Sequence, residues 1–221
     1  MSFGRKSFDL SVYVIIDPAV LPKGRGVGEV TLAALRGGAT FLQLRNKVDS
    51  LDVVREQALE IVRLLDDPLY RTVVFVMDDY VALAAELDLD GVHVGQEDMP
   101  AAQARELIGD DKILGLTAYK QAHYDALDSK IVDYVGTGPV YPTLTKPDKA
   151  VLGIGGFANL VANAPVPVVG IGGITPDNAS DVIHAGADGV AMIRAVVAAL
   201  DPEGATQDFV SAVQRGRRGM V

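Results

Sequence analysis

The stretch 167–193, PVVGIGGITPDNASDVIHAGADGVAMI, decides the fold of this chain. A short apolar run at 167–171 leads through a glycine-rich turn into 177–185, which begins with helix-start residues, and a second apolar run follows at 189–193. Short β-branched runs separated by an amphipathic stretch indicate parallel strands joined by a crossover helix. The stretch therefore predicts one strand–helix–strand unit.

The same pattern recurs along the whole chain. Runs typical of strands lie at 12–17, 40–45, 72–78, 91–94, 113–118, 134–137, 167–171 and 189–193. Stretches typical of helices lie at 28–36, 50–65, 80–87, 100–107, 120–128, 155–163, 177–185 and 194–200. Eight strands in strict alternation with eight helices favour an α/β fold of the closed (β/α)8 type, a TIM barrel, over the alternative of an open doubly wound sheet. We expect a single domain over residues 1–221 with short flexible termini, and we interpret the basic stretch 215–220 as a frayed end.

The composition excludes several classes of function. Twenty Lys and Arg face 29 Asp and Glu, and the formal net charge of −9 disfavours binding to nucleic acids or anionic membranes. The chain has no Cys, which removes disulfides and thiolate catalysis, and its three His lack the spacing of metal ligands. We interpret His93, inside the predicted strand 91–94, as a packed or hydrogen-bonded residue rather than a catalytic one. No stretch suits a secretory signal or a membrane span, so we expect a cytoplasmic protein.

Positively charged side chains follow two of the predicted strands. In a (β/α)8 barrel the reactive groups lie on the loops after the C-terminal ends of the strands, and Arg45, Lys47 and Lys146 fall there. Together they could hold a highly charged anion such as pyrophosphate, whereas each of them alone could equally be a solvated surface charge. Gln43 and Arg45 are two residues apart on one strand, so we expect them to point to the same side.

Carboxylates and glycines at the same edge also suit phosphate chemistry. Asp79 and Asp98 follow neighbouring strands, and two Asp side chains with phosphate oxygens and water are typical surroundings of Mg²⁺. The alternative is that each Asp caps the helix that follows it. The glycines of 170–175, GIGGIT, would let a phosphate approach backbone N–H groups, although a tight turn alone could also require them.

Six segments of the chain resemble the thiamine phosphate synthase family, and together they span most of its length. They are GGATFLQLRNK at 37–47, DLDGVHVGQEDMP at 88–100, ILGLTA at 113–118, DYVGTGPVYPTLTKPD at 133–148, VVGIGGITPDNA at 168–179 and AGADGV at 185–190. The combination of GQEDMP, GPVYPTLTKPD and GIGGITPDN is specific, because an unrelated phosphate-binding barrel would share only the glycines.

The resemblance implies a particular reaction and a set of partners. Members of this family join 4-amino-2-methyl-5-hydroxymethylpyrimidine diphosphate to 4-methyl-5-(2-phosphoethyl)thiazole, with Mg²⁺ and no organic cofactor. Pyrophosphate leaves first, and the thiazole nitrogen captures a pyrimidine carbocation. The expected partners are therefore small-molecule substrates, and both a monomer and a homo-oligomer stay open.

The resemblance also implies residue roles. Gln43, Arg45 and Lys47 would contact the pyrimidine diphosphate, Lys146 its pyrophosphate, and Asp79 and Asp98 the Mg²⁺. Thr143 and Thr145 would contact the thiazole phosphate, with Gly173 and the backbone of Ile193 and Arg194 around its phosphate group. Asp78 and Thr117 complete the implied substrate contacts, and the implied catalytic residues are Arg45, Lys47, Thr117 and Lys146.

Five positions depart from the family pattern. The family usually has Glu, Asn, Ser, His and Ser where this chain has Asn46, Asp78, Thr117, Tyr119 and Arg194. Thr117 keeps the hydroxyl, whereas an ionised Asp78 can only accept hydrogen bonds and could instead tighten Mg²⁺ binding. Arg194 could add a charged contact to the thiazole phosphate or crowd its site.

Two alternative functions follow from these departures. A thiazole tautomerase-like isomerase would share the barrel and the glycines, but GQED and TLTK and the absence of an imidazole at Tyr119 argue against it. A noncatalytic homologue that binds thiamine phosphate is the other alternative.

Overall fold

The apolar runs form eight short strands, and β-branched and aromatic residues dominate them. The computed structural model describes residues 6–144 and 150–219. The strands are β1 (Val12–Ile16), β2 (Phe41–Leu44), β3 (Val74–Asp78), β4 (Gly91–Val94), β5 (Ile113–Thr117), β6 (Tyr134–Thr137), β7 (Val168–Ile171) and β8 (Gly189–Met192). All eight predicted strands are confirmed, with ends that shift by at most two residues.

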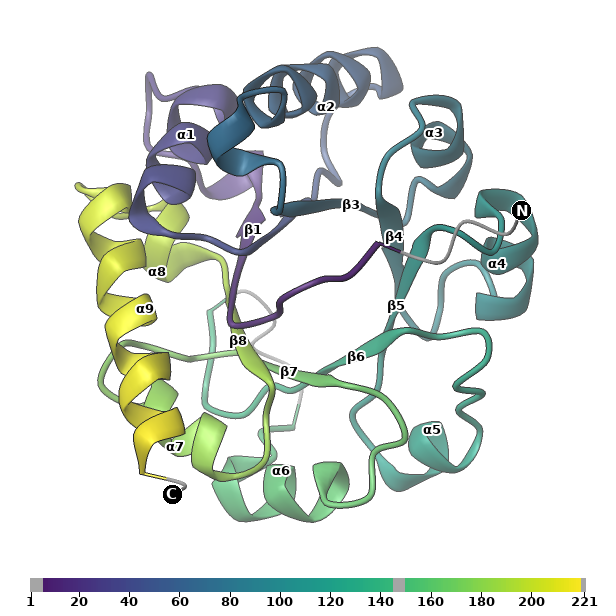
Figure 1. Ribbon diagram of the computed structural model, residues 1–221, viewed down its shortest axis with the longest axis vertical. Helices are drawn as coiled ribbons and strands as arrows, with labels where there is room; N and C mark the ends of the chain where they lie inside the picture. The colour runs from purple at the N-terminus through teal and green to yellow at the C-terminus, as the bar shows by residue number, and fades with distance from the viewer. Residues whose placement is uncertain (1–5, 145–149, 220–221) are drawn as a thin grey trace.

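The strands pair in sequence order and in parallel, and β1 closes the sheet by pairing with β8 (Figure 1). The helices surround this barrel: α1 (Val27–Gly37), α2 (Leu51–Leu65), α3 (Val81–Glu86), α4 (Ala101–Ile108), α5 (Gln121–Asp125), α6 (Gly153–Val161), α7 (Ala179–His184), α8 (Arg194–Val197) and α9 (Pro202–Arg218). Two single 3₁₀ turns, η1 (Pro18–Val20) and η2 (Pro68–Tyr70), lie in connecting loops. The predicted TIM barrel is confirmed, and the open doubly wound sheet is excluded.

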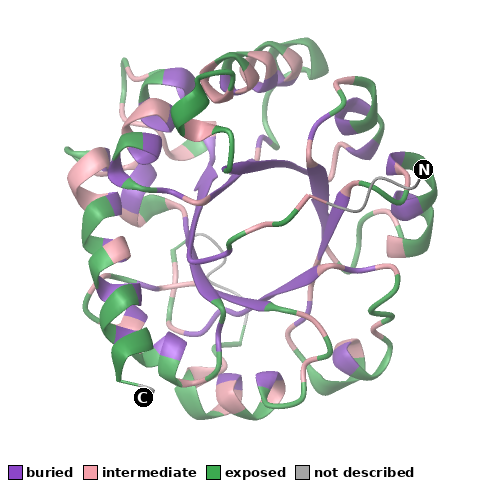
Figure 2. Ribbon diagram, in the orientation of Figure 1, coloured by how far each residue is buried: buried purple, intermediate pink, exposed green. Residues whose placement is uncertain are grey.

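Alternation along each strand separates two hydrophobic layers. In β1, Val12, Val14 and Ile16 face outward and pack with apolar residues of the helices, whereas Tyr13 and Ile15 face the barrel interior. Strands buried on both faces are typical of parallel sheets, and Figure 2 shows the strands buried around the whole ring. The strands therefore lie between two buried layers, one inside the barrel and one beneath the helices.

The segment before β1 covers the N-terminal end of the barrel. Phe8 packs against Phe41 and Tyr134, with ring centroids 6.1 and 6.0 Å apart. The Lys6 ammonium donates to the Asp90 carboxylate at 3.0 Å and to the Val73 carbonyl at 3.1 Å, and both partners lie just before strands. Figure 1 shows this segment crossing the barrel opening. The interior is thus closed at the end opposite the expected site.

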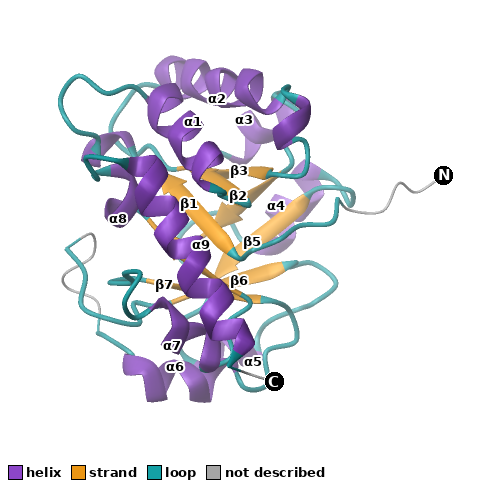
Figure 3. Ribbon diagram, turned by 60° about the vertical axis from the view of Figure 1, so that its left-hand side comes forward, coloured by secondary structure: helices purple, strands orange, loops and turns teal. Residues whose placement is uncertain are grey.

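The helix α9 was not predicted. It begins where Asp201 accepts a hydrogen bond from the Gly204 N–H at 3.0 Å, with Pro202 in the first turn. It packs against α1, α7 and α8 (Figure 3). It therefore covers the outside of the barrel where the last strand, β8, pairs with the first, β1. The expectation of a frayed end at 215–220 is wrong for 215–218, because Gly216 packs closely on Ile183 and Arg217 donates to the Asp188 carbonyl at 2.8 Å.

Within the described residues, no helix has both the length and the apolar character needed to cross a bilayer.

Replacement of Phe209 tests whether α9 is part of the core. Its side chain is fully buried, so Phe209→Ala should lower the free energy of unfolding by about 3–5 kcal/mol in urea denaturation. The matched control is Gln207→Ala on the exposed side of the same helix, which should change it by less than about 0.5 kcal/mol. Equal effects of the two variants would contradict the packing role of α9.

Candidate active site

A cavity of about 480 Å³ opens at the C-terminal ends of the strands. It brings together eight of the predicted site residues: Gln43, Arg45, Asp78, Thr117, Thr143, Gly173, Ile193 and Arg194. Three others, Lys47, Asp79 and Asp98, lie beside it on the loops after β2, β3 and β4. Thr145 and Lys146 lie outside the described residues. The prediction that Gln43 and Arg45 point to the same side is confirmed, since both line the cavity.

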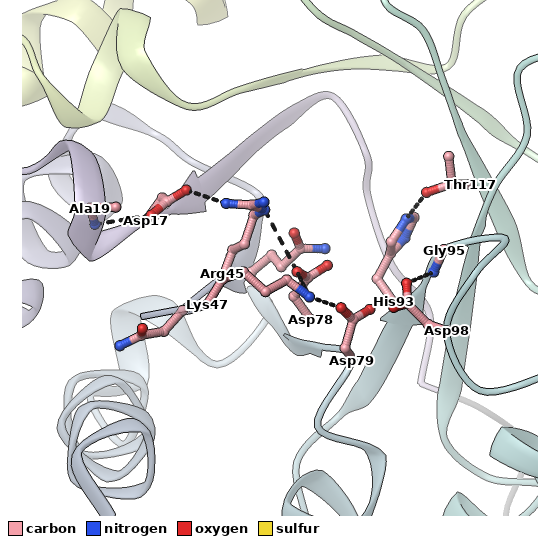
Figure 4. Close-up of polar contacts among 12 residues, drawn as sticks. Asp17, Ala19, Arg45, Lys47, Asp78, Asp79, His93, Gly95, Asp98 and Thr117 are labelled. Carbon is pink, nitrogen blue, oxygen red and sulfur yellow. Dashed lines mark hydrogen bonds and ion pairs between the residues drawn. The ribbon is translucent and has the colours of Figure 1, made fainter. Parts of the chain in front are cut away.

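Two carboxylates hold the Arg45 guanidinium at the wall of the cavity. Its Nη1 lies 2.6 Å from Asp17 Oδ2, and its Nε lies 3.7 Å from Asp78 Oδ2 (Figure 4). The Asp17 side chain is only 3% exposed, and its other oxygen accepts from the Ala19 N–H at 3.0 Å. Sequence reasoning missed Asp17, although its position between a strand and Pro18 marks it as a capping residue.

Lys47 bridges the two neighbouring aspartates after β3. Its ammonium lies 3.2 Å from Asp78 Oδ2 and also contacts Asp79 Oδ2. The backbone of Asp79 has φ 62°, and its N–H donates to the His93 carbonyl at 3.0 Å, which fixes the turn next to β4. Cations and carboxylates therefore alternate across this edge of the cavity.

Neither Asp79 nor Asp98 caps the helix that follows it. Tyr80 and Pro100 occupy the N-cap positions of α3 and α4, and neither helix has a side-chain cap. Asp98 Oδ2 instead accepts from the Gly95 N–H at 2.8 Å, within its own loop. Asp79 Oδ1 is buried and has no hydrogen-bond partner among the described residues. An unpaired buried carboxylate oxygen of this kind suits a cation as its partner.

The glycines after β7 are required by a close approach of two loops. Gly172 and Gly173 have φ values of 96° and 66°, in the left-handed region that favours glycine. A Cβ at Gly173 would lie 2.4 Å from the Pro142 carbonyl oxygen, in the loop after β6. The tight turn considered as an alternative reason for these glycines therefore does require them. Gly172 and Gly173 also line the cavity.

Hydrogen-bonded side chains form the floor of the cavity. Gln43 Nε2 donates to the Tyr13 hydroxyl at 2.7 Å, and that hydroxyl lies 2.9 Å from the hydroxyl of Tyr134. His93 Nδ1 lies 3.1 Å from the Tyr134 hydroxyl, and its Nε2 lies 3.0 Å from Thr117 Oγ1. The interpretation of His93 as a hydrogen-bonded residue is confirmed, whereas Tyr13 and Tyr134 were missed because their partners lie far away in sequence.

Asn46 and Tyr119, two of the departures from the family pattern, lie away from the cavity. Asn46 is buried and ties the loop after β2 together, because its Nδ2 donates to Asp49 at 2.7 Å and to Gln57 at 2.9 Å. Tyr119 packs edge-on against His123, with ring centroids 4.5 Å apart. Asp78, Thr117 and Arg194 do line the cavity, and Arg194 is exposed at its edge.

Together, the fold and the cavity define a class: a (β/α)8 barrel with a polar, cation-bearing pocket at the carboxyl ends of its strands, as in barrel enzymes that act on phosphorylated molecules. The family model of thiamine monophosphate synthase matches residues 12–196. The chain therefore belongs to the thiamine monophosphate synthase family.

Individual relatives agree with this family. The thiamine-phosphate synthase of Laribacter hongkongensis is 42% identical over 93% of this chain and 96% of its own. That of Chloroflexus aurantiacus is also 42% identical, over 96% and 93%. The structure of thiamine phosphate pyrophosphorylase from Pyrococcus furiosus superposes with a TM-score of 0.83 at 36% identity, over 94% of this chain and 96% of that one. The resemblance and the implied function, a transferase that makes thiamine phosphate, are confirmed.

Two tyrosines of the floor make stability depend on alkaline pH. Burial raises the pKa of Tyr13 and of Tyr134 well above the ordinary value of about 10. Both phenols therefore stay neutral in the folded protein while they ionise in the unfolded chain above pH 10. A pKa that is raised on folding gives a contribution to stability that is complete below the unfolded pKa, about 10 for tyrosine. This contribution is lost progressively as the pH rises from there toward the raised pKa of the folded protein.

Tyr134→Phe tests this dependence. Above pH 10 each such tyrosine should lower the free energy of unfolding by about 1.4 kcal/mol per pH unit, so the decline should be shallower in the variant by that amount. Urea denaturation between pH 9 and 11 measures the slope. Equal slopes in the two proteins would contradict the raised pKa of Tyr134.

Proposed function

We propose that the chain joins a hydroxymethylpyrimidine diphosphate to a thiazole phosphate with release of pyrophosphate. The observation that carries the proposal is the convergence of residues from all eight strands, or from the loops after them, on one cavity, with Arg45 in its wall and Lys47 beside it. In the reaction the bond between the pyrimidine methylene carbon and the diphosphate oxygen breaks. A bond from that carbon to the thiazole nitrogen then forms.

Arg45 and Lys47 bind the diphosphate of the pyrimidine substrate. Both are now paired with carboxylates, Arg45 with Asp17 and Lys47 with Asp78 and Asp79. These pairs hold the cations in place before the substrate arrives, and charge grows on the leaving pyrophosphate as the carbon–oxygen bond breaks. Preorganised cations stabilise that charge most strongly where water is excluded. Lys146, outside the described residues, is proposed to contact the same pyrophosphate.

The opposite wall of the cavity holds the thiazole phosphate. Thr143 and Gly173 lie there on facing loops, and Ile193 and Arg194 end β8 and begin α8. Their backbone and side-chain donors suit a phosphate, and the exposed Arg194 adds a positive charge to that rim. We assign Thr145 to the same substrate by its place in the family motif.

We propose that Asp79 and Asp98 bind Mg²⁺ together with the diphosphate. The unpaired Asp79 Oδ1 supports this assignment, since Lys47 contacts the other carboxylate oxygen, Oδ2. Among the described residues, no group of three or more His, Asp or Glu side chains could hold a metal alone. Mg²⁺ usually completes its shell with phosphate oxygens and water, and when bound it neutralises charge on the departing diphosphate.

Apolar residues in the cavity wall also protect the proposed reaction. Ile15, Val169 and Ile171 line the pocket next to the polar floor. An apolar wall keeps water away from the pyrimidine carbocation until the thiazole nitrogen captures it. A cytoplasmic location stays a prediction, and both a monomer and a homo-oligomer stay open.

The assay mixes the protein with both substrates and measures thiamine phosphate as its fluorescent thiochrome. We expect product with Mg²⁺ and none in excess EDTA. Asp79→Asn should raise the Mg²⁺ concentration for half-maximal rate at least about 10-fold, because even groups that only support a metal ligand contribute 10–100-fold. Asp208→Asn on the exposed face of α9 is the control and should leave it unchanged.

Three results would count against these assignments. Folded protein that makes no product would refute the synthase. Full activity in EDTA would refute the metal requirement, and an unchanged Mg²⁺ dependence in Asp79→Asn would remove Asp79 from the metal site.

A further inference from the structure

A continuous chain of hydrogen bonds crosses the barrel interior under the cavity. It links five side chains from five different strands: Gln43, Tyr13, Tyr134, His93 and Thr117. Its two ends, Gln43 and Thr117, both line the cavity, whereas Tyr134 in the middle is fully buried and does not. Figure 4 shows the last link, from the His93 ring to Thr117.

The donors and acceptors along this chain run in one direction. The Gln43 amide nitrogen can only donate, so the Tyr13 oxygen accepts from it and the single Tyr13 hydroxyl proton is directed to Tyr134. Tyr134 then directs its own proton to His93 Nδ1. An imidazole that accepts at Nδ1 carries its proton at Nε2 in the neutral form, and it donates from there to Thr117 Oγ1.

The direction determines what the cavity offers at Thr117. Its oxygen accepts from His93, and no described residue accepts its hydroxyl proton. That proton is therefore available to a molecule in the cavity. If the imidazole instead carried its proton at Nδ1, His93 Nε2 would be an acceptor. The Thr117 hydroxyl would then donate its proton to Nε2 and have none for a molecule in the cavity.

We propose that Tyr134 is a positioning residue that sets the tautomer of His93 and thereby makes the Thr117 hydroxyl a donor to an aromatic nitrogen of the bound substrate. The identity of that substrate, an aminopyrimidine, rests on the proposed function. The tautomer of His93 does not.

The packing around Tyr134 shows that the barrel is built for this contact. A Cβ at Gly115 would lie 2.2 Å from Tyr134 Cζ and 2.5 Å from His93 Nδ1, so β5 leaves out a side chain where the two rings meet. The Tyr134 ring also packs against Phe41 and His93, with centroids 5.4 and 5.5 Å apart. These contacts hold the Tyr134 hydroxyl beside the imidazole, 3.1 Å from His93 Nδ1.

The first test measures the tautomer in the wild-type protein without any substrate. The chain has only three histidines, so ¹⁵N NMR at pH 8.5 with His93→Gln as the assignment control resolves the His93 ring. We expect a proton on Nε2 and none on Nδ1. A proton on Nδ1 would overturn the proposal, whether or not the chain is a synthase.

The second test compares two buried tyrosines that lose the same hydroxyl. In Tyr134→Phe we expect His93 to become a mixture of the two tautomers. The KM for the pyrimidine diphosphate should rise about 10-fold, as for one lost hydrogen bond. The KM for the thiazole phosphate and kcat should stay within about twofold of the wild-type values. Tyr124→Phe is the matched control, because Tyr124 is buried and its hydroxyl lies 2.6 Å from Thr137 Oγ1, outside the chain. It should leave the tautomer and both KM values unchanged.

Equal KM changes in the two variants would refute a positioning role. If Tyr134→Phe does not fold, Thr117→Val replaces it, because that change removes the same donor at the cavity. It should raise the pyrimidine KM to a similar degree, and Thr117→Ser should restore it. An unchanged KM in Thr117→Val would overturn the proposal.

Discussion

The pairing of β1 with β8 is the constraint on which the remaining structure depends. It joins Val12 to Val190 and Tyr13 to Ala191 in register, and it turns an eight-stranded parallel sheet into a closed ring. Closure places every C-terminal strand end on one rim, and it directs alternate side chains into a single interior. Residues as distant in sequence as Tyr13 and Tyr134 can therefore share a hydrogen bond. The helix α9 covers this seam from outside, which explains why a largely polar helix belongs to the core.

Polar groups are stabilised in different ways at the rim and on the floor of the cavity. At the rim, Arg45 and Lys47 are already matched by Asp17, Asp78 and Asp79, so the diphosphate of the proposed reaction would exchange partners with carboxylates instead of meeting isolated cations. On the floor, burial would make an unpaired polar group costly, and the five-membered chain satisfies each group in turn. Charges at the rim are thus paired with opposite charges, whereas neutral hydrogen-bonding groups form the floor.

The sequence predicts the parts of this arrangement that depend on local pattern. The spacing of apolar residues, with a period of 2 in strands and 3.6 in helices, predicts the strands and their alternation with helices. Barrel topology then predicts that the polar residues at the strand ends meet, so Gln43, Arg45 and Thr117 could be placed at one site in advance. Asp17 and Tyr134 could not, because their roles come from contacts across the barrel. The helix α9 was missed since its apolar positions are few and the count of eight helices was already complete.

Closure of the barrel at its N-terminal end has a consequence for the order of events. Phe8 lies against Phe41 and Tyr134, and Lys6 ties the same segment to Asp90, so within the described residues the interior opens only at the C-terminal rim. A pocket with a single mouth constrains the order in which two substrates enter. In the proposed reaction the pyrimidine diphosphate rests on the floor, so we expect it to enter before the thiazole phosphate, and we expect the product that keeps the pyrimidine ring to leave after pyrophosphate.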